Sequence, residues 1–396
     1  MTILLWFLVI ILIVILLVIL DFKAGKKNHK KNLRKLTFPE TTGSYRFFQS
    51  GNRLFEAMFT DIKNAEAHID ILFFIIKKDE TSQRFFQLLQ QKAEEGVTVR
   101  LMVDRLGGFR IDKSLQTQLE NSGIQFIFAA KPEFPFFIYK LNRRNHRKIV
   151  VIDGKIAYAG GYNIADEYVS KDAEMGDWRD YHLRFTGEIV EQLHAVFLDD
   201  WFLNTNEKLF PAENKEKGNH ALQLLPTEYG ELEEVLVKKF SEAKEEILLG
   251  SPYFIPPRRV MDTLIQAVKR GITVKLLCPL KSDHPFVKEG GIPFYEELYQ
   301  AGGDVRFYDA GFYHTKVFIV DGNFCDIGTS NLDIRSFYLN KEINVFFYDK
   351  DFIEEMRQRF MKDFDIGLSF DENWLAKRSI GTKINIKIAR LLRPIL

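Results

Sequence analysis

The amino-acid sequence predicts an α/β protein made of two similar repeats, each a mixed β-sheet flanked by helices, with one N-terminal transmembrane helix. Three observations lead to this class. A short polar motif occurs once in each half, strand–helix–strand patterns surround both copies, and the first residues are uniformly apolar. With 396 residues the chain is long enough for two units that each have a core.

Residues 1–22 are predicted to form the transmembrane helix. Residues 3–20 are all apolar, which is close to the roughly 20 residues that a helix needs to cross a bilayer. A secretory signal peptide is the alternative. It is disfavoured because no Lys or Arg precedes the apolar run and no small-residue cleavage site follows it.

A basic segment, residues 23–39, follows and is predicted to be a juxtamembrane linker. Its cations are Lys23, Lys26, Lys27, Lys30, Lys31, Arg34 and Lys35. The positive-inside rule then predicts a single-pass protein of the cell membrane whose body lies in the cytoplasm. The same cations predict attraction to anionic headgroups.

Residues 40–203 and 221–375 are predicted to be the two repeats, joined by an Asn-, Lys- and Glu-rich linker at 204–220. In the first, an apolar strand at 69–76 precedes a helix at 85–96 and a strand at 97–103. The second has the same order, and GVTVRL (96–101) corresponds to GITVKL (271–276). Such short connections favour helices on the faces of a sheet.

The repeated motif is His-x-Lys-x4-Asp. It reads HRKIVVID at 146–153 and HTKVFIVD at 314–321. The motif residues are His146, Lys148 and Asp153 in the first copy, and His314, Lys316 and Asp321 in the second. A Gly (Gly160, Gly328) and then an Asn (Asn163, Asn331) follow at the same spacing in both copies. The agreement indicates a duplicated unit that carries one imidazole, one ammonium and one amide per copy.

The spacing predicts how these groups are presented. Residues 149–152 and 317–320 are apolar and end in Asp-Gly, which predicts a buried strand followed by a tight turn. Residues i and i+2 of a strand share a face, so each His projects with its Lys. The Asp sits at the turn, where it forms the turn or an ion pair. The glycines permit close backbone approach, and the Asn amides can donate to an oxyanion. Two histidines satisfied within a core are the alternative.

The segments RNHRKIVVIDGKIAYAGGYNIADEY and HTKVFIVDGNFCDIGTSNLDIRSFYLNKEI resemble the phospholipase D superfamily and, within it, bacterial cardiolipin synthases. The resemblance extends from about residue 40 to the C-terminus. It implies two phospholipase D-like sheets side by side, with the active site at the interface between the repeats. Many bacterial cardiolipin synthases are thought to carry two membrane helices, whereas this sequence predicts one.

The resemblance also implies a reaction. Two phosphatidylglycerols would be joined with release of glycerol, without metal or other cofactor. The catalytic set would be the six motif residues, with Asn163 and Asn331 binding the phosphate. One neutral histidine would form a phosphohistidine, while the other, protonated, would act as acid and then base. Similar two-motif enzymes favour His146 as the nucleophile.

Two acids are candidates for orienting the histidines. Aligning DYHLRF (180–185) with EINVFF (342–347) places Asp180 and Glu342 at matching positions. The superfamily has an acid near this point that fixes the histidine tautomer. The spacing within each repeat pairs Glu342 with His314 and Asp180 with His146. This pairing favours His314 as the better oriented nucleophile, so the assignment of the nucleophile stays open.

Three further features are compatible with a lipid substrate. His284 lies in a loop just after the strand-like segment 272–278, where it either contacts substrate or is an ordinary loop residue. Residues 131–145 are aromatic and basic, and form either a lid or membrane-contacting rim or part of the core. Residues 376–396 are a basic amphipathic tail, which predicts an interfacial helix, with ordinary packing as the alternative. The remaining histidines are expected to be structural or exposed.

Other functions use the same motifs. A hydrolytic phospholipase D, an anchored phosphodiesterase or a nuclease would replace the acceptor alcohol with water, and an inactive membrane scaffold would keep only the fold. The net charge of +1 disfavours nucleic acid as a partner. Two intact motifs disfavour the scaffold. Anionic phospholipids are therefore the expected partners, and the sequence leaves homo-oligomerisation open.

Overall fold

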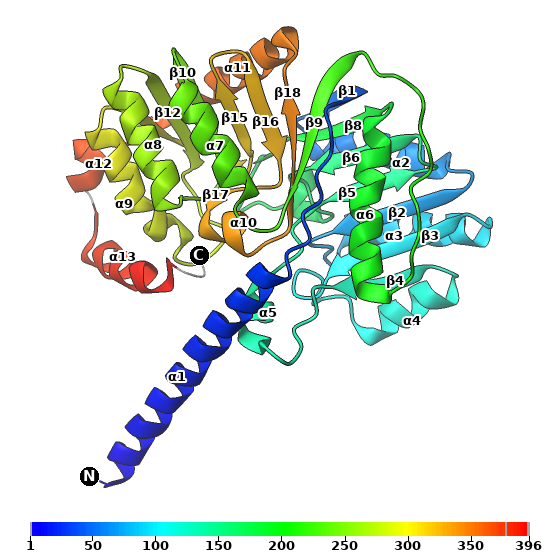
Figure 1. Ribbon diagram of the computed structural model, residues 1–396, viewed down its shortest axis with the longest axis horizontal. Helices are drawn as coiled ribbons and strands as arrows, with labels where there is room; N and C mark the ends of the chain where they lie inside the picture. Colours follow the sequence, from blue (N-terminus) through cyan, green and yellow to red (C-terminus); the bar gives the residue numbers. More distant parts are fainter. Residues whose placement is uncertain (1, 377, 394–396) are drawn as a thin grey trace.

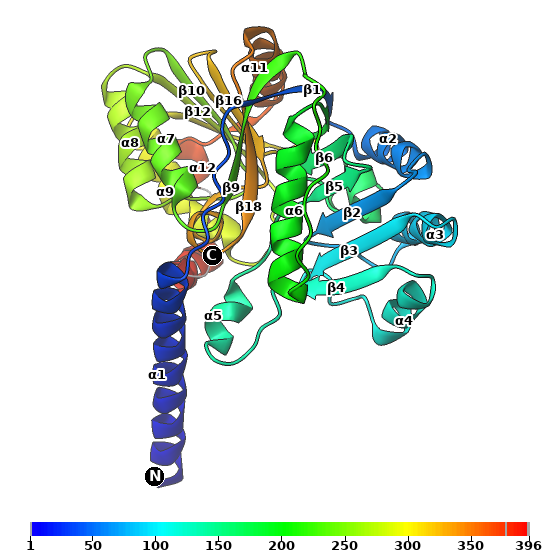
Figure 2. The same ribbon diagram turned by 45° about the vertical axis from the view of Figure 1, so that its right-hand side comes forward.

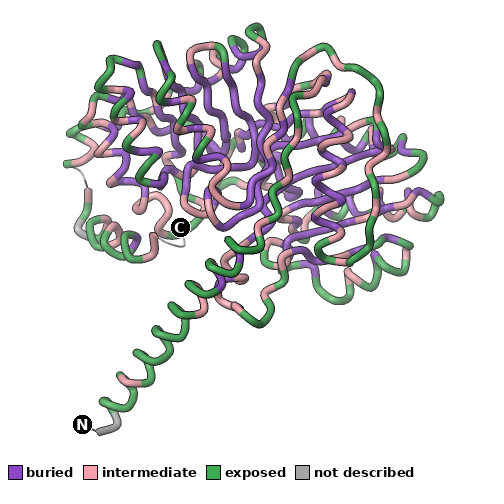
Figure 3. The backbone as a smooth tube through the Cα atoms, in the orientation of Figure 1, coloured by how far each residue is buried: buried purple, intermediate pink, exposed green. Residues whose placement is uncertain are grey.

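The computed structural model describes residues 2–376 and 378–393. Two lobes lie side by side, and a long helix, α1 (Thr2–Lys31), projects from the side on which they meet (Figure 1). Leu4–Lys31 is apolar enough to cross a membrane, with a mean hydropathy of 3.3 in its most apolar window. The side chains of this window are exposed rather than packed on the body (Figure 3).

Helix α1 differs from the prediction at its C-terminal end. It continues to Lys31, through the first part of the segment predicted as a linker. There the side chains of Lys26 and Lys30 lie over the ring of Tyr229. The basic segment is therefore partly helical and packed on the body.

The first lobe alternates strands and helices in the predicted order. Its elements are β1 (Thr41–Phe48), α2 (Gly51–Lys63), β2 (His68–Phe73), α3 (Glu80–Glu94), β3 (Thr98–Asp104), α4 (Lys113–Asn121), β4 (Gln125–Ala129), α5 (Phe137–Asn142), β5 (Ile149–Ile152), β6 (Ile156–Gly160), the 3-10 helix η1 (Asp166–Val169), β7 (Trp178–Arg179), β8 (His182–Thr186) and α6 (Ile189–Thr205).

The second lobe repeats this order. Its elements are β9 (His220–Thr227), α7 (Glu231–Glu242), β10 (Glu246–Gly250), β11 (Phe254–Ile255), α8 (Arg258–Lys269), β12 (Thr273–Pro279), α9 (Val287–Gln300), β13 (Asp304–Tyr308), β14 (Phe312–Tyr313), β15 (Val317–Val320), β16 (Phe324–Gly328), β17 (Leu332–Asp333), α10 (Ile334–Tyr338), β18 (Glu342–Phe347) and α11 (Lys350–Asp365). The chain ends with β19 (Leu368–Ser369), α12 (Glu372–Ala376) and α13 (Ile380–Leu392). Residues 377 and 394–396 of the predicted tail lie outside the described residues.

The sheet order confirms the duplication. Repeat 1 reads β1-β8-β6-β5-β2-β3-β4, and repeat 2 reads β9-β18-β16-β15-β10-β12-β13. Both sheets are mixed, because β2–β3 and β10–β12 pair in parallel whereas β5–β6 and β15–β16 pair antiparallel. Strands β1 and β9 pair antiparallel and join the two sheets.

The core has three parts that follow the layers. One apolar cluster lies between the sheet of repeat 1 and α2 and α3, and a second lies between the sheet of repeat 2 and α7, α8 and α9. The third draws residues from both repeats, including α6 and α11. Figure 2 shows α6 standing between the two sheets. This shared core fixes the lobes against each other and so fixes the interface that carries the motifs.

Candidate active site

The two motif histidines line one cavity between the repeats, of about 600 Å³. Its walls come from the ends of β2, β3 and β12 and from the segments after β6 and β16. Polar lining residues include Lys77, Arg110, Arg144, Asn163, Glu167, Asp283, His284, Asn331 and Arg335, and apolar ones include Phe74, Leu106, Phe109, Tyr168, Trp178 and Tyr253. The resemblance to the phospholipase D superfamily implied that the two histidines meet at the interface between the repeats, and this arrangement agrees with it.

Each histidine is bonded to a carboxylate from the other repeat. His146 Nδ1 lies 2.8 Å from Glu342 Oε2, and His314 Nδ1 lies 2.6 Å from Asp180 Oδ2. An ionised carboxylate only accepts hydrogen bonds, so each Nδ1 donates and carries the ring proton. In the neutral ring Nε2 is then the nitrogen with a free lone pair, available as a nucleophile or base.

The pairing expected within each repeat is therefore wrong, and backbone contacts give the reason. Strand β14 pairs in parallel with β7, matching Tyr313 with Arg179, so His314 lies beside Asp180. An isolated parallel bridge between Asn145 and Lys341 brings His146 beside Glu342 in the same way. The segment before each motif thus crosses to the other repeat.

The carboxylate of Glu342 is held by several neutral donors. Its Oε2 accepts from Thr329 Oγ1 at 2.6 Å, and its Oε1 accepts from Ser336 Oγ at 3.0 Å and Asn340 Nδ2 at 3.2 Å. Burial raises the pKa of Glu342, but His146, the charge of Lys148 and the Thr329 hydroxyl outweigh it, so the pKa is lowered. Glu342 is therefore ionised at neutral pH and holds the His146 ring in one orientation.

Asp180 has a different environment. It accepts from the backbone N–H of Tyr181 at 2.8 Å and lies 3.4 Å from Lys316 Nζ. Burial raises its pKa, but Lys316 and His314 outweigh this effect and lower it. The two His–carboxylate pairs are thus alike in geometry, while one is held by neutral donors and the other lies beside an ammonium group.

Burial favours the neutral form of both histidines. It lowers the pKa of His146 to about 4, against the opposing effect of Glu342. Burial and then the Lys316 charge lower the pKa of His314. A bound anion opposes these effects, because negative charge favours the protonated ring.

The motif lysines lie behind the rings. Lys148 Nζ donates to the backbone oxygen of His146 at 2.8 Å, and Lys316 Nζ donates to that of His314. Both are buried, and burial lowers the pKa of Lys148 to about 7 and also lowers that of Lys316. Neither lysine lines the cavity, so their charges act on it through the layer formed by the histidines.

The two asparagines both reach the cavity wall. Asn163 Oδ1 accepts from the backbone N–H of Ile75 at 3.0 Å, and its Nδ2 donates to Tyr168 Oη at 3.2 Å. The predicted close approach at the motif glycines is confirmed. A Cβ on Gly328 would lie 2.4 Å from the backbone oxygen of Ile343.

Gly161 offers a direct test of the Asp180 position. A Cβ there would lie 2.2–2.4 Å from the carboxylate atoms of Asp180, whereas the matching residue of repeat 2, Thr329, donates to Glu342. We expect Gly161→Ala to displace Asp180 from His314 and lower kcat by about 100-fold, because an ångström-scale misplacement has effects of that size. Steady-state assays beside Gly381→Ala, whose Cβ would make only an ordinary van der Waals contact, 3.6 Å from Ser379 Oγ, provide the check. Equal activity of both variants would contradict the role of Asp180.

The motif aspartates lie away from the cavity, at the far ends of β5 and β15. Asp153 has φ 53° and accepts from the backbone N–H groups of residues 66–68 at 2.7–2.9 Å. Asp321 has φ 50° and accepts from those of residues 244–246 at 2.8–3.0 Å. Their expected place at the turn is confirmed, and grouping them with reacting residues is not supported by this position.

His284 lines the cavity with its side chain largely exposed. Next to it, both oxygens of Asp283 accept from Tyr253 Oη, at 2.7 and 2.8 Å. The sequence reasoning missed this pair, and also the donors around Glu342. Two of these donors, Ser336 and Asn340, stand within six residues of Glu342 in the sequence SFYLNKE, which is a signal for their contact.

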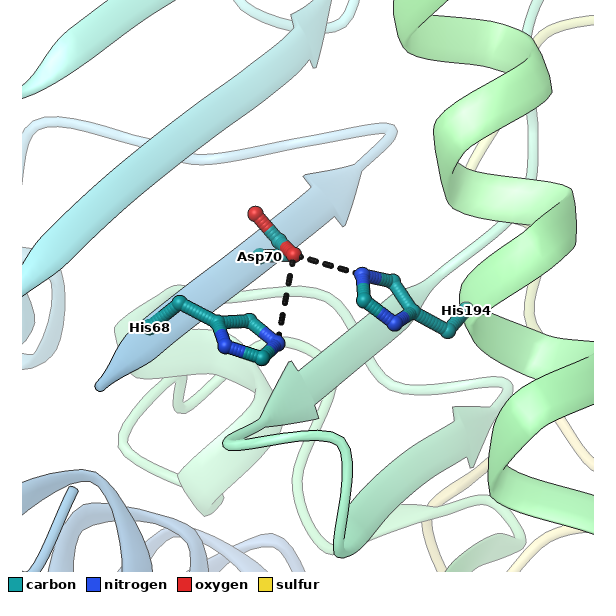
Figure 4. A group of neighbouring side chains, drawn as sticks. All are labelled: His68, Asp70 and His194. Carbon is teal, nitrogen blue, oxygen red and sulfur yellow. Dashed lines mark hydrogen bonds and ion pairs between the residues drawn. The ribbon is translucent and has the colours of Figure 1, made fainter. Parts of the chain in front are cut away.

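One group of side chains outside the cavity has the composition of a metal site. His68, Asp70 and His194 offer ligand atoms within 4.8 Å of one another (Figure 4). Asp70 is already paired with Arg100 at 2.9 Å and accepts from His194 Nε2 at 2.8 Å. The backbone N–H of Ala212 donates to His194 Nδ1 at 3.4 Å, which leaves no ring proton on that nitrogen. The group fits a buried ion network that joins α6 to β2.

Comparisons with known proteins agree with this geometry. The family described as "Cardiolipin synthase, PLD-like domain" matches residues 58–201 and 236–364, one match in each repeat. The minor cardiolipin synthase ClsB of Bacillus subtilis (strain 168) is 36% identical over 92% of this chain and 92% of its own. A cardiolipin synthase of Geobacillus kaustophilus (strain HTA426) is 35% identical over 88% of this chain and 71% of its own.

A solved structure supports the fold. The phosphatidylserine synthase of Haemophilus influenzae Rd KW20 superposes with a TM-score of 0.70, at 16% identity, over 94% of this chain and 100% of that chain. Cardiolipin synthases are phosphatidyltransferases within the phospholipase D superfamily. With both repeats matched by one family and relatives aligned over most of their length, the chain belongs to the cardiolipin synthase family.

Proposed function

We propose that the chain is a membrane-anchored cardiolipin synthase that moves a phosphatidyl group from one phosphatidylglycerol to another and releases glycerol. The observation that carries the proposal is the pair of histidines in one cavity, each held through Nδ1 by a carboxylate of the opposite repeat. Family membership supplies the substrate class.

In the first half-reaction, Nε2 of neutral His146 attacks phosphorus and the bond to the glycerol oxygen breaks. His314, protonated once the anionic lipid is bound, gives its Nε2 proton to the departing oxygen. The product is a phosphatidyl group on His146 Nε2 and free glycerol. Glu342 stabilises the positive charge that the substituted ring acquires.

In the second half-reaction, neutral His314 accepts the proton from a hydroxyl of the second phosphatidylglycerol. That oxygen attacks phosphorus, the P–N bond breaks, and cardiolipin leaves with both histidines restored. Lys148 and Lys316 stabilise the negative oxygens from behind the rings, and Asn163 and Asn331 donate to them from the wall. Every proton and bond is thus accounted for by protein and lipid groups.

The choice of His146 as nucleophile has support from its surroundings. Glu342, its partner, is fixed by Thr329, Ser336 and Asn340, so the ring is held rigidly. Lys316 lies beside the His314–Asp180 pair and lowers the pKa of His314, which helps that ring to give up its Nε2 proton to the leaving oxygen. Glu342 bonds His146 and not His314, so its position gives no support to His314 as the nucleophile.

Anchoring is part of the proposal. Helix α1 would cross the membrane, with the basic residues that follow the apolar run and the catalytic body on the cytoplasmic side. Asp21 ends the uncharged run and accepts from the backbone N–H of Tyr139 in α5 at 3.0 Å. This contact supports a fixed position of the body relative to the helix.

The proposal is tested by product analysis. Purified full-length protein in lipid nanodiscs receives phosphatidylglycerol labelled in the phosphate, and the lipids are separated. We expect cardiolipin and glycerol in equal amounts, and unchanged rates after EDTA treatment. Phosphatidate without cardiolipin would instead identify a hydrolytic phospholipase D. A strict requirement for a divalent cation in the chemical step would contradict the mechanism.

The pH dependence follows from the shifted histidines. The reactive form has His146 neutral and His314 protonated, and burial lowers the pKa of both below 6.5. We therefore expect kcat/KM to be bell-shaped with its maximum on the acid side of pH 6.5, and kcat to peak at higher pH because bound phosphate raises the pKa of His314. The two apparent values belong to the coupled pair.

The Asp180→Asn variant tests the direction in which Asp180 shifts the pKa of His314. Asp180 raises the pKa of His314, so Asp180→Asn should lower it and move the alkaline limb of kcat/KM to lower pH. Profiles of the parent and the variant, with chemistry established as rate-limiting, check this shift. A profile that stays flat between about pH 5 and 9 would contradict the acid–base scheme.

A further inference from the structure

An exposed aromatic loop lies beside the end of the apolar run of α1. Residues 130–136 connect β4 to α5, and the side chain of Phe134 is 85% exposed and stacks on Phe137. The Phe22 ring contacts Tyr139 of α5, with centroids 5.4 Å apart. Because Phe22 lies two residues after the last residue of the apolar run, Leu20, the loop lies at the level where a membrane crossed by α1 would end.

The same loop leaves the sheet next to a segment that lines the cavity. Strands β3 and β4 are parallel and in register at Asp104 and Ala129, so the segments that follow them leave the sheet at one edge. The segment after β3 supplies Leu106 and Phe109 to the cavity wall, and Phe109 is 67% exposed. The rim of the cavity next to the loop is therefore apolar and open.

Helix α5 connects the loop to the segment that carries His146. Arg144, a cavity residue two positions before His146, donates to the backbone oxygen of Lys140. Arg335, on the opposite repeat, donates to the backbone oxygen of Asn142 at 2.8 Å. The loop, α5 and the catalytic His146 are thus parts of one continuous segment.

Helix α13 offers a second apolar surface. Ile386 and Ala389 face the body next to α9, whereas Ile384, Ile388 and Leu391 are exposed on the opposite face with i, i+4, i+7 spacing. Leu391 is 81% exposed. The helix also carries Lys383, Lys387 and Arg390 and no acid. Apolar and cationic residues together are typical of a helix that lies in an anionic lipid surface.

These features lie on one side of the molecule. Figures 1 and 2 both place α5, α13 and the body end of α1 on the side from which α1 projects, opposite α11. A soluble protein partner would need no membrane helix beside its docking surface and would match the cations of α13 with acids. A bilayer accounts for the apolar loop, the basic helix and α1 together.

We propose that this lipid-facing surface, made of Leu106, Phe109, Phe134, Ile384, Ile388 and Leu391, lies in the surface of an anionic bilayer, so that phospholipids enter the cavity directly from the membrane. The proposal rests on the anchoring and lipid substrate of the proposed function. It adds a specific orientation of the body and an entry route past Leu106 and Phe109.

Environment-sensitive probes on single cysteines test the orientation. The two native cysteines, Cys278 and Cys325, are buried, so introduced cysteines can be labelled selectively. A nitrobenzoxadiazole probe is placed at Phe134→Cys, at Leu391→Cys and at Asp351→Cys. Asp351 is an exposed residue of α11, beyond the end of β18 far from Glu342. The proteins are studied in nanodiscs with about one-third phosphatidylglycerol.

We expect blue-shifted emission and quenching by nitroxide-labelled lipids at positions 134 and 391 and neither effect at 351. A probe at Ile10→Cys, within α1, reports anchoring separately. Quenching at position 10 without quenching at 134 and 391 would overturn the lipid-facing surface while leaving the anchor intact. No quenching at any of these positions would overturn both.

A functional comparison tests the entry route. Phe134→Asp combined with Leu391→Asp should lower turnover of bilayer phosphatidylglycerol by about tenfold and leave turnover of a monomeric short-chain phosphatidylglycerol unchanged. Phe134→Leu with Leu391→Ile keeps the apolar character and should retain both activities. Equal turnover of bilayer lipid by the two double variants would contradict the route, and so would an equal loss on both substrates by the Asp variant.

Discussion

His146→Ala and His314→Ala are each expected to lower kcat by about 10⁴-fold or more, because each removes a group that makes or breaks a bond in both half-reactions. The two rings share one cavity, and His284, the further imidazole among its described lining residues, is largely exposed and lies 3.9 Å from Asp283. In each variant the remaining motif histidine has a different role in the reaction, so it cannot replace the ring that was removed.

His220→Asn is the matched control. His220 is part-buried and its Nδ1 lies 3.1 Å from Asp349, but it does not line the cavity. Turnover of labelled phosphatidylglycerol, with thermal unfolding measured on the same preparations, should separate loss of chemistry from loss of fold. Activity in His146→Ala within about tenfold of the parent would exclude that ring as nucleophile.

Glu342→Gln and Asp180→Asn should each lower kcat by about 10²- to 10⁴-fold, because the neutral amide no longer stabilises the charged ring or fixes its tautomer. Because of the crossed pairing, the two substitutions impair different steps of the reaction. Glu342 acts on the attacking ring, while Asp180 acts on the ring that protonates the leaving oxygen.

A substrate with a good leaving group separates them. A p-nitrophenyl phosphodiester of a diacylglycerol needs little protonation of its departing oxygen, so adduct formation in Asp180→Asn should recover towards the parent rate. Glu342→Gln should stay slow with either substrate. Asp70→Asn, which alters a His–carboxylate pair outside the cavity, should change stability but not turnover per folded molecule. Recovery of Glu342→Gln alone would mean that the roles are reversed.

The sequence predicts the local structure around the motifs closely, because that structure depends on neighbouring residues. Strands β5 and β15 occupy the predicted 149–152 and 317–320, and both Asp-Gly pairs have positive φ. Parallel pairing of the strands that carry GVTVRL and GITVKL with their predecessors follows from the short strand–helix–strand connections. The apolar runs, the Asp-Gly turn residues and the short connections are sufficient to predict these features.

The crossed His–carboxylate pairs could not be predicted in this way. Glu342 is separated from His146 by 196 residues, and the bridge between Asn145 and Lys341 sets their register. Spacing within one repeat carries no information about a contact between repeats. The loop before α5 has no counterpart in repeat 2, so its position beside α1 also becomes known only from the assembled fold.

The central claim is that a phosphatidyl group is carried covalently on His146. Rapid quenching of the reaction with labelled phosphatidylglycerol, followed by peptide mapping, tests it in the parent, His146→Asn and His314→Asn. We expect the label on His146 in the parent and its absence in His146→Asn. Label that remains in His146→Asn and is lost in His314→Asn would reverse the assignment, and no label in active parent enzyme, despite a quench faster than turnover, would contradict covalent catalysis.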